Sequence, residues 1–208
     1  MKNISFYSLV AVAIFSVVSA CGKNDSSALD AMADLDGTWD RTCSADSDGS
    51  GESSRTSTTY SGGDVTFIFH QFADPACTTD MYTFKLVSTY GGGSSVASAV
   101  GAKELDVTPL KLVFNLKTDD MVAAFNGVAG NTPVCGGGFV KNTDKDLSAT
   151  DCANDANFSK LLKPLYTIYK IEGLRLYGGL CGDAGSADDC STPGKRATTL
   201  DTEASSNG

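Results

Sequence analysis

Apolar and polar side chains alternate along most of the chain after residue 36, in short runs separated by clusters of Gly, Asp and Ser. Because successive side chains of a strand point to opposite faces of a sheet, a period of two residues is typical of strands with one buried face. The pattern predicts strands at residues 37–43, 54–60, 65–72, 81–90, 104–116, 146–151, 166–171, 174–178 and 197–202.

Local residues indicate where these strands turn or bend. In residues 166–177, two alternating runs flank Glu172 and Gly173, and glycine can adopt the positive φ that a tight hairpin requires. Pro109 cannot donate a hydrogen bond to a central ladder, so we expect it to bend or divide the strand at residues 104–116.

One segment departs from the alternation and predicts a short helix over residues 118–126. Thr118 is a suitable N-cap, and two acidic residues follow it in the first turn. Asn126 and Gly127 then provide a stop signal.

Eight or nine antiparallel strands with one short helix predict an all-β fold. The 208 residues are enough for one domain, which we expect over residues 36–202. Closing the strands into a single up-and-down barrel removes exposed edges, which otherwise pair with other chains. A two-sheet sandwich is the alternative.

The charge balance excludes one class of partner. The chain has 16 Lys and Arg against 25 Asp and Glu, a net charge of −9. Binding to a phosphate backbone depends on clustered Lys and Arg, so we expect no nucleic acid partner. The single histidine, His70, excludes His-rich metal and acid–base sites.

The N-terminus has the three parts of a secretory signal. Lys2 gives a positive start, residues 9–15 form an apolar run, and residues 18–20 are a small-residue cleavage zone. The run is too short for a transmembrane anchor. Residues 1–20 are therefore predicted to be a signal peptide.

Residues 18–21 read Val-Ser-Ala-Cys, which resembles the lipobox of bacterial lipoproteins. The resemblance implies that Cys21 carries a diacylglycerol, which anchors the protein to a membrane. Gly rather than Asp at residue 22 implies the outer membrane, with the protein facing the periplasm or the cell surface. We expect a lipidated tether at residues 21–35 and a disordered tail at residues 203–208.

Removing Cys21 leaves six cysteines, which suggests three disulfides in an oxidising compartment. Many pairings are open to six cysteines, and the sequence does not choose among them. The simplest is local: Cys43–Cys77, Cys135–Cys152 and Cys181–Cys190. Zinc sites need cysteines at shorter spacing or partner histidines.

Gly37-Thr38-Trp39 at the first strand and Arg196 before the last resemble the lipocalin pattern. The resemblance implies that Trp39 closes one barrel end and that Arg196 stacks on its indole, a cation–π contact.

A wider likeness covers most of residues 36–202. It includes Cys135-Gly136, Cys152 and the Tyr-rich hairpin at residues 166–178. The chain resembles small bacterial envelope lipoproteins with lipocalin-like barrels. It is loosely similar to the lipid-binding ectodomain of the animal adenomatosis-polyposis down-regulated proteins.

Candidate chemistry is sparse. There is no Gly-x-Ser-x-Gly motif, and His70 alternates with Phe69 on a strand, as a wall residue does. Asp46, Asp48 and Glu52 resemble half of a calcium loop, but the Glu of a full loop and its flanking helices are missing, and a solvated hairpin tip is the favoured interpretation. We expect no catalytic residue, no cofactor and no resident metal.

These signals predict a membrane-anchored, non-enzymatic envelope lipoprotein whose barrel binds a small hydrophobic ligand or lipid. Phe67, Phe69, Tyr82 and Phe84 are the candidate lining residues, since they alternate on two strands. The alternative is a filled barrel that contacts another envelope protein through its loops. A hydrolase with carboxylates at the barrel mouth is a third hypothesis.

The lipid anchor is directly testable, because Cys21 is the proposed acyl acceptor. The substitution Cys21→Ser should leave an uncleaved precursor without diacylglycerol. Metabolic labelling of the host bacterium with a fatty acid measures this. A variant that still carries the label would contradict the assignment.

Overall fold

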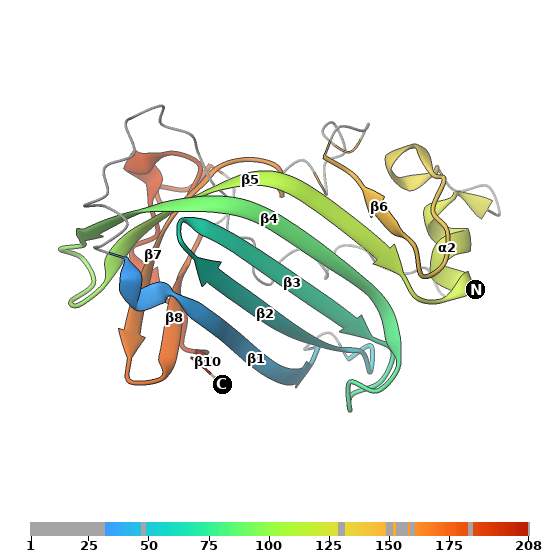
Figure 1. Ribbon diagram of the computed structural model, residues 1–208, viewed down its shortest axis with the longest axis horizontal. Coiled ribbons are helices and arrows are strands. Elements are labelled where there is room, and N and C mark those ends of the chain that lie inside the picture. The colour runs from blue at the N-terminus through green and yellow to red at the C-terminus, as the bar shows by residue number, and fades with distance from the viewer. Residues whose placement is uncertain are drawn as a thin grey trace.

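Eight antiparallel strands close into a barrel in the computed structural model (Figure 1), which describes residues 32–46, 49–128, 132–148, 152, 158, 161–182 and 185–207. The ring runs in the order β10–β1–β2–β3–β4–β5–β7–β8, and β8 pairs back with β10. The strands are β1 (Gly37–Ala45), β2 (Ser53–Ser61), β3 (Asp64–Phe72), β4 (Asp80–Ser95), β5 (Lys103–Leu116), β7 (Leu165–Glu172), β8 (Arg175–Leu180) and β10 (Ser205–Asn207). The predicted all-β barrel is confirmed.

Two short strands lie outside the ring. β6 (Asp144–Asp146) pairs with β5, and β9 (Thr199–Leu200) pairs with β8. The sequence placed longer strands at residues 146–151 and 197–202. β6 overlaps the first prediction at Asp146 alone, with residues 147–148 outside any strand and residues 149–151 outside the described residues, and the second is reduced to a two-residue pairing.

The C-terminal residues correct one prediction. Residues 203–208 were expected to form a disordered tail, but Ser205–Asn207 form β10 and pair with both β1 and β8. Arg41 on β1 adds an ion pair to Asp201, 2.5 Å away, and donates to the carbonyl of Glu203. The edges of β1 and β8 provide backbone hydrogen-bond partners for these residues. The polar sequence of the tail does not by itself indicate a strand.

The N-terminal boundary is also corrected. The tether was expected to extend to residue 35, yet Met32 and Leu35 are fully buried. A 3-10 turn at Ala33–Leu35 precedes β1, and the carbonyl of Leu35 accepts a hydrogen bond from the indole of Trp39, at 2.8 Å. The folded domain therefore includes Met32. Cys21 and the proposed signal peptide lie outside the described residues.

The longest strands, β4 and β5, pair with two irregularities. Ser88 is opposite Pro109 and Val87 is opposite Lys111, so Leu110 is an extra, exposed residue. The bend expected at Pro109 is this bulge, within a continuous strand. Further along β4, Gly92 has φ +120°, and a Cβ there would lie 2.6 Å from the carbonyl oxygen of Glu104. Only glycine allows this close approach.

The predicted helix is α2 (Asp119–Phe125), and Thr118 caps it by accepting a hydrogen bond from Met121 N. Two further 3-10 turns lie at Val134–Gly136 and Pro193–Lys195. No helix in the described residues is both long and apolar enough to cross a membrane.

Two apolar clusters fill the barrel from opposite ends. The first, called here the closed-end cluster, lies where β7, β8 and β10 complete the ring and includes Trp39, Tyr60, Tyr90, Leu105 and Ile168. The second, called the helix-end cluster, lies beneath α2 and includes Phe69, Tyr82, Phe114, Phe125 and Phe158. Phe114 contacts Tyr82, Phe84, Phe125 and Phe158 through its ring.

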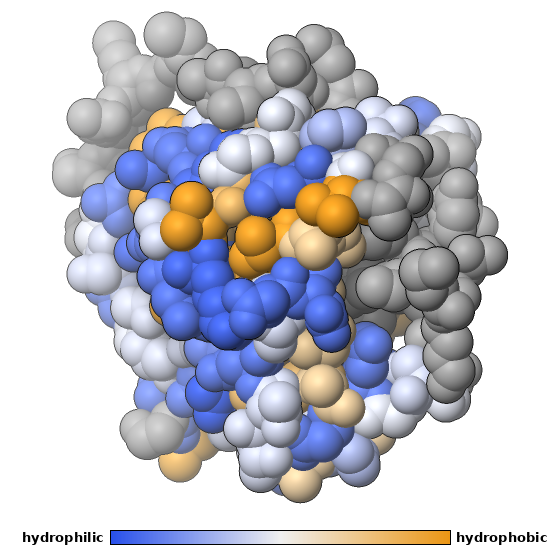
Figure 2. Space-filling view, turned by 90° about the vertical axis from the view of Figure 1, so that its right-hand side faces the viewer, coloured by the Kyte–Doolittle hydropathy of each residue, from blue (hydrophilic) through white to orange (hydrophobic). Residues whose placement is uncertain are grey.

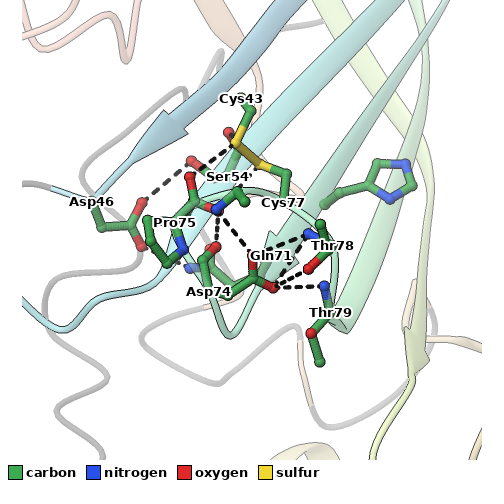
Figure 3. Close-up of a disulfide and its surroundings, with 12 residues drawn as sticks. Cys43, Asp46, Ser54, Gln71, Asp74, Pro75, Cys77, Thr78 and Thr79 are labelled. Atoms are coloured by element: carbon green, nitrogen blue, oxygen red, sulfur yellow. Dashed lines mark hydrogen bonds between the residues drawn. A yellow bond between two sulfur atoms is a disulfide. The ribbon is translucent and has the colours of Figure 1, made fainter.

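Three disulfides join the pairs predicted by proximity in sequence. The distance between the two Cα atoms is 6.0 Å in Cys43–Cys77, 4.6 Å in Cys135–Cys152 and 5.5 Å in Cys181–Cys190. The first links β1 to the loop between β3 and β4 (Figure 3).

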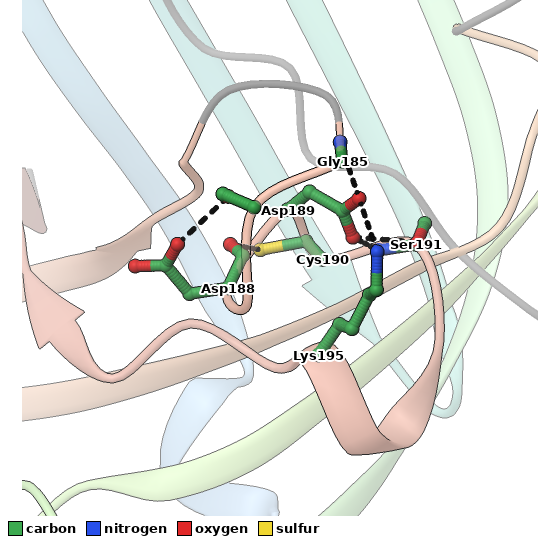
Figure 4. Close-up of polar contacts among 7 residues, drawn as sticks. Gly185, Asp188, Asp189, Cys190, Ser191 and Lys195 are labelled. Carbon is green, nitrogen blue, oxygen red and sulfur yellow. Dashed lines mark hydrogen bonds and ion pairs between the residues drawn. The ribbon is translucent and has the colours of Figure 1, made fainter.

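Asp189 organises the loop closed by the third disulfide (Figure 4). Its carboxylate accepts hydrogen bonds from the Ser191 hydroxyl, at 2.5 Å, from Lys195 Nζ, at 2.9 Å, and from the backbone of Gly185. Ser191 and Lys195 together hold the pKa of Asp189 well below its usual range. The Asp189 carboxylate therefore stabilises the conformation of this loop.

Candidate functional site

A small, largely apolar cavity lies in the barrel interior between the two clusters. Its volume is about 20 Å³. The lining residues are Thr58, Tyr60, Val65, Phe67, Phe84, Leu86, Ser88, Val107 and Leu161. Because the lining draws on both clusters, the cavity marks the place where they meet.

Strand alternation places most of this lining. Phe67 on β3 is opposite Thr58 on β2 and Leu86 on β4, so three neighbouring strands present side chains to one point. Tyr60 and Val65 form the next inward pair toward the closed end. Leu161 comes instead from outside the ring, in a turn in which its N–H donates to the carbonyl of Phe158.

Two of the four predicted lining residues line this cavity, and two do not. Phe67 and Phe84 are in its wall and are only half-buried. Phe69 and Tyr82 lie deeper in the helix-end cluster, where Phe69 stacks on Phe84 with ring centroids 5.1 Å apart and on Tyr82 at 6.2 Å. Phe114 from β5 stacks on Tyr82 there, with ring centroids 6.0 Å apart.

The polar groups of the lining are hydroxyls. Burial raises the pKa of Tyr60, and the neighbouring Tyr90, whose ring meets it edge-on at 5.1 Å, acts in the same direction. Burial also raises the pKa of Tyr90 to about 12, supported by its hydrogen bond to Asp36. Tyr60 therefore stays neutral at ordinary pH, and no lining residue in the described part of the chain carries a charge.

Such a lining can exclude water and orient a neutral ligand by one or two hydrogen bonds. Among the described residues of the lining there is no carboxylate, histidine, cysteine or lysine that could transfer a proton or attack a substrate. The arrangement is suited to binding.

Trp39 and Arg196 are both at the closed end, but they do not form the expected pair. Trp39 is 2% exposed and belongs to the closed-end cluster. The ring under Arg196 is that of Tyr166, 5.5 Å from the guanidinium carbon. Arg196 also donates to the carbonyl of Thr167, at 2.8 Å, and pairs with Asp106, at 2.7 Å. It therefore joins β5 to β7.

His70 lies on the opposite face of β3 from the cavity, since its neighbour Phe69 points inward. It stacks on Phe72 and lies 3.6 Å from Asp80. Burial lowers its pKa, and the charge of Arg55 lowers it further, while Asp80 opposes the shift. His70 is thus a wall residue on the outside of the barrel.

The candidate calcium residues are only partly described. Asp48 lies outside the described residues. Asp46 and Glu52 flank the hairpin between β1 and β2 and both contact the side chain of Gln71. No group of three or more His, Cys, Asp or Glu side chains in the described part of the chain is arranged to hold a metal ion.

Sequence reasoning missed the other seven lining residues, which are Thr58, Tyr60, Val65, Leu86, Ser88, Val107 and Leu161. Ser88 and Val107 occupy inward positions on strands that were predicted, so alternation could have identified them. Leu161 belongs to a connection between strands, where no periodicity signals which side chain turns inward.

Comparison with known proteins assigns no family to this chain. No family model matches it, and no curated protein matches it.

The role of Arg196 can be measured through stability. Arg196→Met keeps the length of the side chain but leaves the Thr167 carbonyl without its donor and Asp106 without its ion-pair partner. The free energy of unfolding should fall by about 2 kcal/mol, because buried hydrogen bonds to charged groups are lost.

Urea denaturation gives this value. Arg175→Met, at an exposed position on β8, is the matched control and should change stability little. Equal effects of the two substitutions would contradict the role assigned to Arg196.

Proposed function

We propose that this protein is a non-enzymatic lipoprotein of the bacterial outer membrane, anchored through Cys21, whose barrel binds a small apolar ligand between the two clusters. The half-buried state of Phe67 and Phe84 carries the ligand part of this proposal, and the lipobox-like residues 18–21 support the anchor. Both rings belong to the interior face of the barrel, yet part of their surface is uncovered. Covering that surface would release water and favour binding of an apolar molecule.

The volume of the cavity limits the ligand. About 20 Å³ has room for little more than a water molecule, whereas an apolar cavity of about 150 Å³ is needed to hold benzene. Binding therefore requires a side chain to move. Leu161 is the side chain that can move at least cost, because it enters from outside the ring and its displacement breaks no pairing between strands.

This requirement favours a compact ligand over a long acyl chain. Displacing Leu161 would join its own volume to the existing cavity, with Phe67 and Phe84 as walls and Ser88 as a hydrogen-bonding group. A neutral molecule fits this lining better than an anion does, because none of the lining residues that the structure describes is a cation.

The second candidate function is contact with another envelope protein by a filled barrel. The small volume of the cavity supports it. So does a cluster of apolar surface within a mostly hydrophilic face on the side of α2 (Figure 2). Val128 and Val140, which follow α2 in the chain, are each about 60% exposed.

A binding titration distinguishes the two functions. Residues 22–208, without the acylated cysteine, are titrated with the neutral fluorophore N-phenyl-1-naphthylamine. We expect saturable binding with a dissociation constant in the micromolar range, on the order of −8 kcal/mol of binding free energy. Leu161→Ala should tighten binding because it enlarges the cavity, and Leu161→Trp should weaken it about tenfold because it fills the space.

The control is Lys85→Ala, an exposed residue of β4 next to Phe84 in sequence, which should leave binding unchanged. An absence of saturable binding in the parent protein and in Leu161→Ala would reject the ligand and favour the filled barrel.

A further inference from the structure

The strand that closes the barrel has polar side chains at its inward positions. β10 lies between β1 and β8 (Figure 1) and consists of Ser205, Ser206 and Asn207. Asn207 is directly opposite Trp39 on β1, and Ser205 is directly opposite Leu176 on β8. Side chains that face each other across an antiparallel pair lie on the same side of the sheet. Ser205 and Asn207 therefore point toward the interior, as Trp39 and Leu176 do.

The surroundings of these two inward positions are apolar. Trp39 is 2% exposed and Leu176 is 7% exposed, and both belong to the closed-end cluster. Ser205 and Asn207 remain half-buried themselves. Because stabilisation by burial grows with the apolar area removed from water, a serine and an asparagine contribute little at these positions. Larger apolar side chains would cover Trp39 and Leu176 more favourably.

β10 is also attached to the barrel over a short length. Its register with β1 extends over two residue pairs, and so does its register with β8. One further backbone bond follows at its end, where Asn207 N donates to the carbonyl of Leu174, at 3.0 Å. Residues 202–203, which precede the strand, are exposed. The strand can therefore detach at this point, while Asp201 keeps its ion pair with Arg41.

We propose that the edges of β1 and β8 bind an extended segment of a partner protein in place of β10, and that this segment has apolar side chains two positions apart. We call these edges, Trp39–Asp40 of β1 and Arg175–Leu176 of β8, the closing slot. Backbone hydrogen bonds to both edges would provide affinity, and side chains packed on Trp39 and Leu176 would provide specificity. β10 covers the two edges while no partner is bound, which prevents them from pairing indiscriminately.

The position between the two apolar ones has different neighbours. Ser206 lies between Asp40 and Arg175, and all three residues are exposed. A polar or charged side chain suits this outward position. The closing slot therefore favours the order apolar, polar, apolar in the partner segment. This inference depends neither on the lipid anchor nor on a ligand in the cavity.

Peptide binding to the full-length lipoprotein, kept in neutral detergent micelles, tests the closing slot. The probe is a fluorescent peptide that copies residues 201–207 with valine in place of Ser205 and Asn207. We expect saturable binding with a dissociation constant of about 10–100 μM. A peptide with aspartate at the same two positions should bind about tenfold more weakly or worse, because it would bring charges against Trp39 and Leu176.

Hydrogen–deuterium exchange shows whether the peptide occupies the closing slot. In the saturated complex, the amides of β10 should lose protection, including the Asn207 amide that donates to Leu174. The amides of β1 near Asp40 and of β8 near Arg175 should keep their protection, because the peptide replaces the displaced strand.

Two variants of the chain separate the closing slot from general effects on strand formation. Ser205→Val/Asn207→Val gives β10 the apolar side chains itself, so the melting temperature should rise by about 2–5 °C. Peptide binding should weaken about tenfold or more, because β10 then leaves the slot less often. Ser206→Val adds the same side chain at the outward position and should change peptide binding by less than about twofold.

The proposal is overturned if the valine peptide shows no saturable binding up to about 1 mM. It is equally overturned if the peptide binds while β10 keeps its protection, or if Ser205→Val/Asn207→Val binds the peptide as strongly as the parent does. Dimers that form by exchange of β10 between copies, without peptide binding, would replace the partner protein by a second copy of this chain and so contradict the proposal.

Discussion

Closure of the barrel by a three-residue strand is the constraint on which the rest of the structure depends. β10 pairs with β1 through Asp40 and with β8 through Arg175, both opposite Ser206. Without it, β1 and β8 would each have an open edge, and the closed-end cluster would lose one side of its enclosure. The ion pair between Arg41 on β1 and Asp201 fixes the segment that precedes β10 against β1.

A closed ring of eight strands fixes the interior volume, and the side chains must fill it. Trp39 and its neighbours fill it from the closed end, whereas the phenylalanines beneath α2 fill it from the other. The two clusters do not fill the interior completely. The cavity with Phe67 and Phe84 in its wall is the space left between them. The candidate binding site is therefore a consequence of how the two clusters meet.

The sequence predicted much of this fold because its signals are local. Alternation identified the long strands, Thr118 marked the start of α2, and short separations indicated the disulfides. β10 could not be predicted, because Ser205, Ser206 and Asn207 have no strand propensity of their own. Their conformation depends on edges formed by residues far away in the chain.

The site was predictable only in part for the same reason. Phe67 and Phe84 were identified because they alternate on strands. Phe69 was assigned to the same site because alternation gives the face of a strand and not the depth in the barrel. Its depth follows from its stacking on Tyr82 and Phe84 in the helix-end cluster. The contacts of Gln71 gave no signal in the sequence, because Asp46 and Glu52, to which its amide donates, come together only in the folded hairpin.

Hydrogen–deuterium exchange on a chain that ends at Ala204 tests the importance of closure most directly. The account predicts that the amides of β1 around Asp40 and of β8 around Arg175 lose protection, and that Trp39 fluorescence shifts to the red as its cluster opens. Amides in the middle of β3, which pairs with β2 and β4, should keep more of their protection. Unchanged protection of β1 and β8 in the shortened chain would contradict the account.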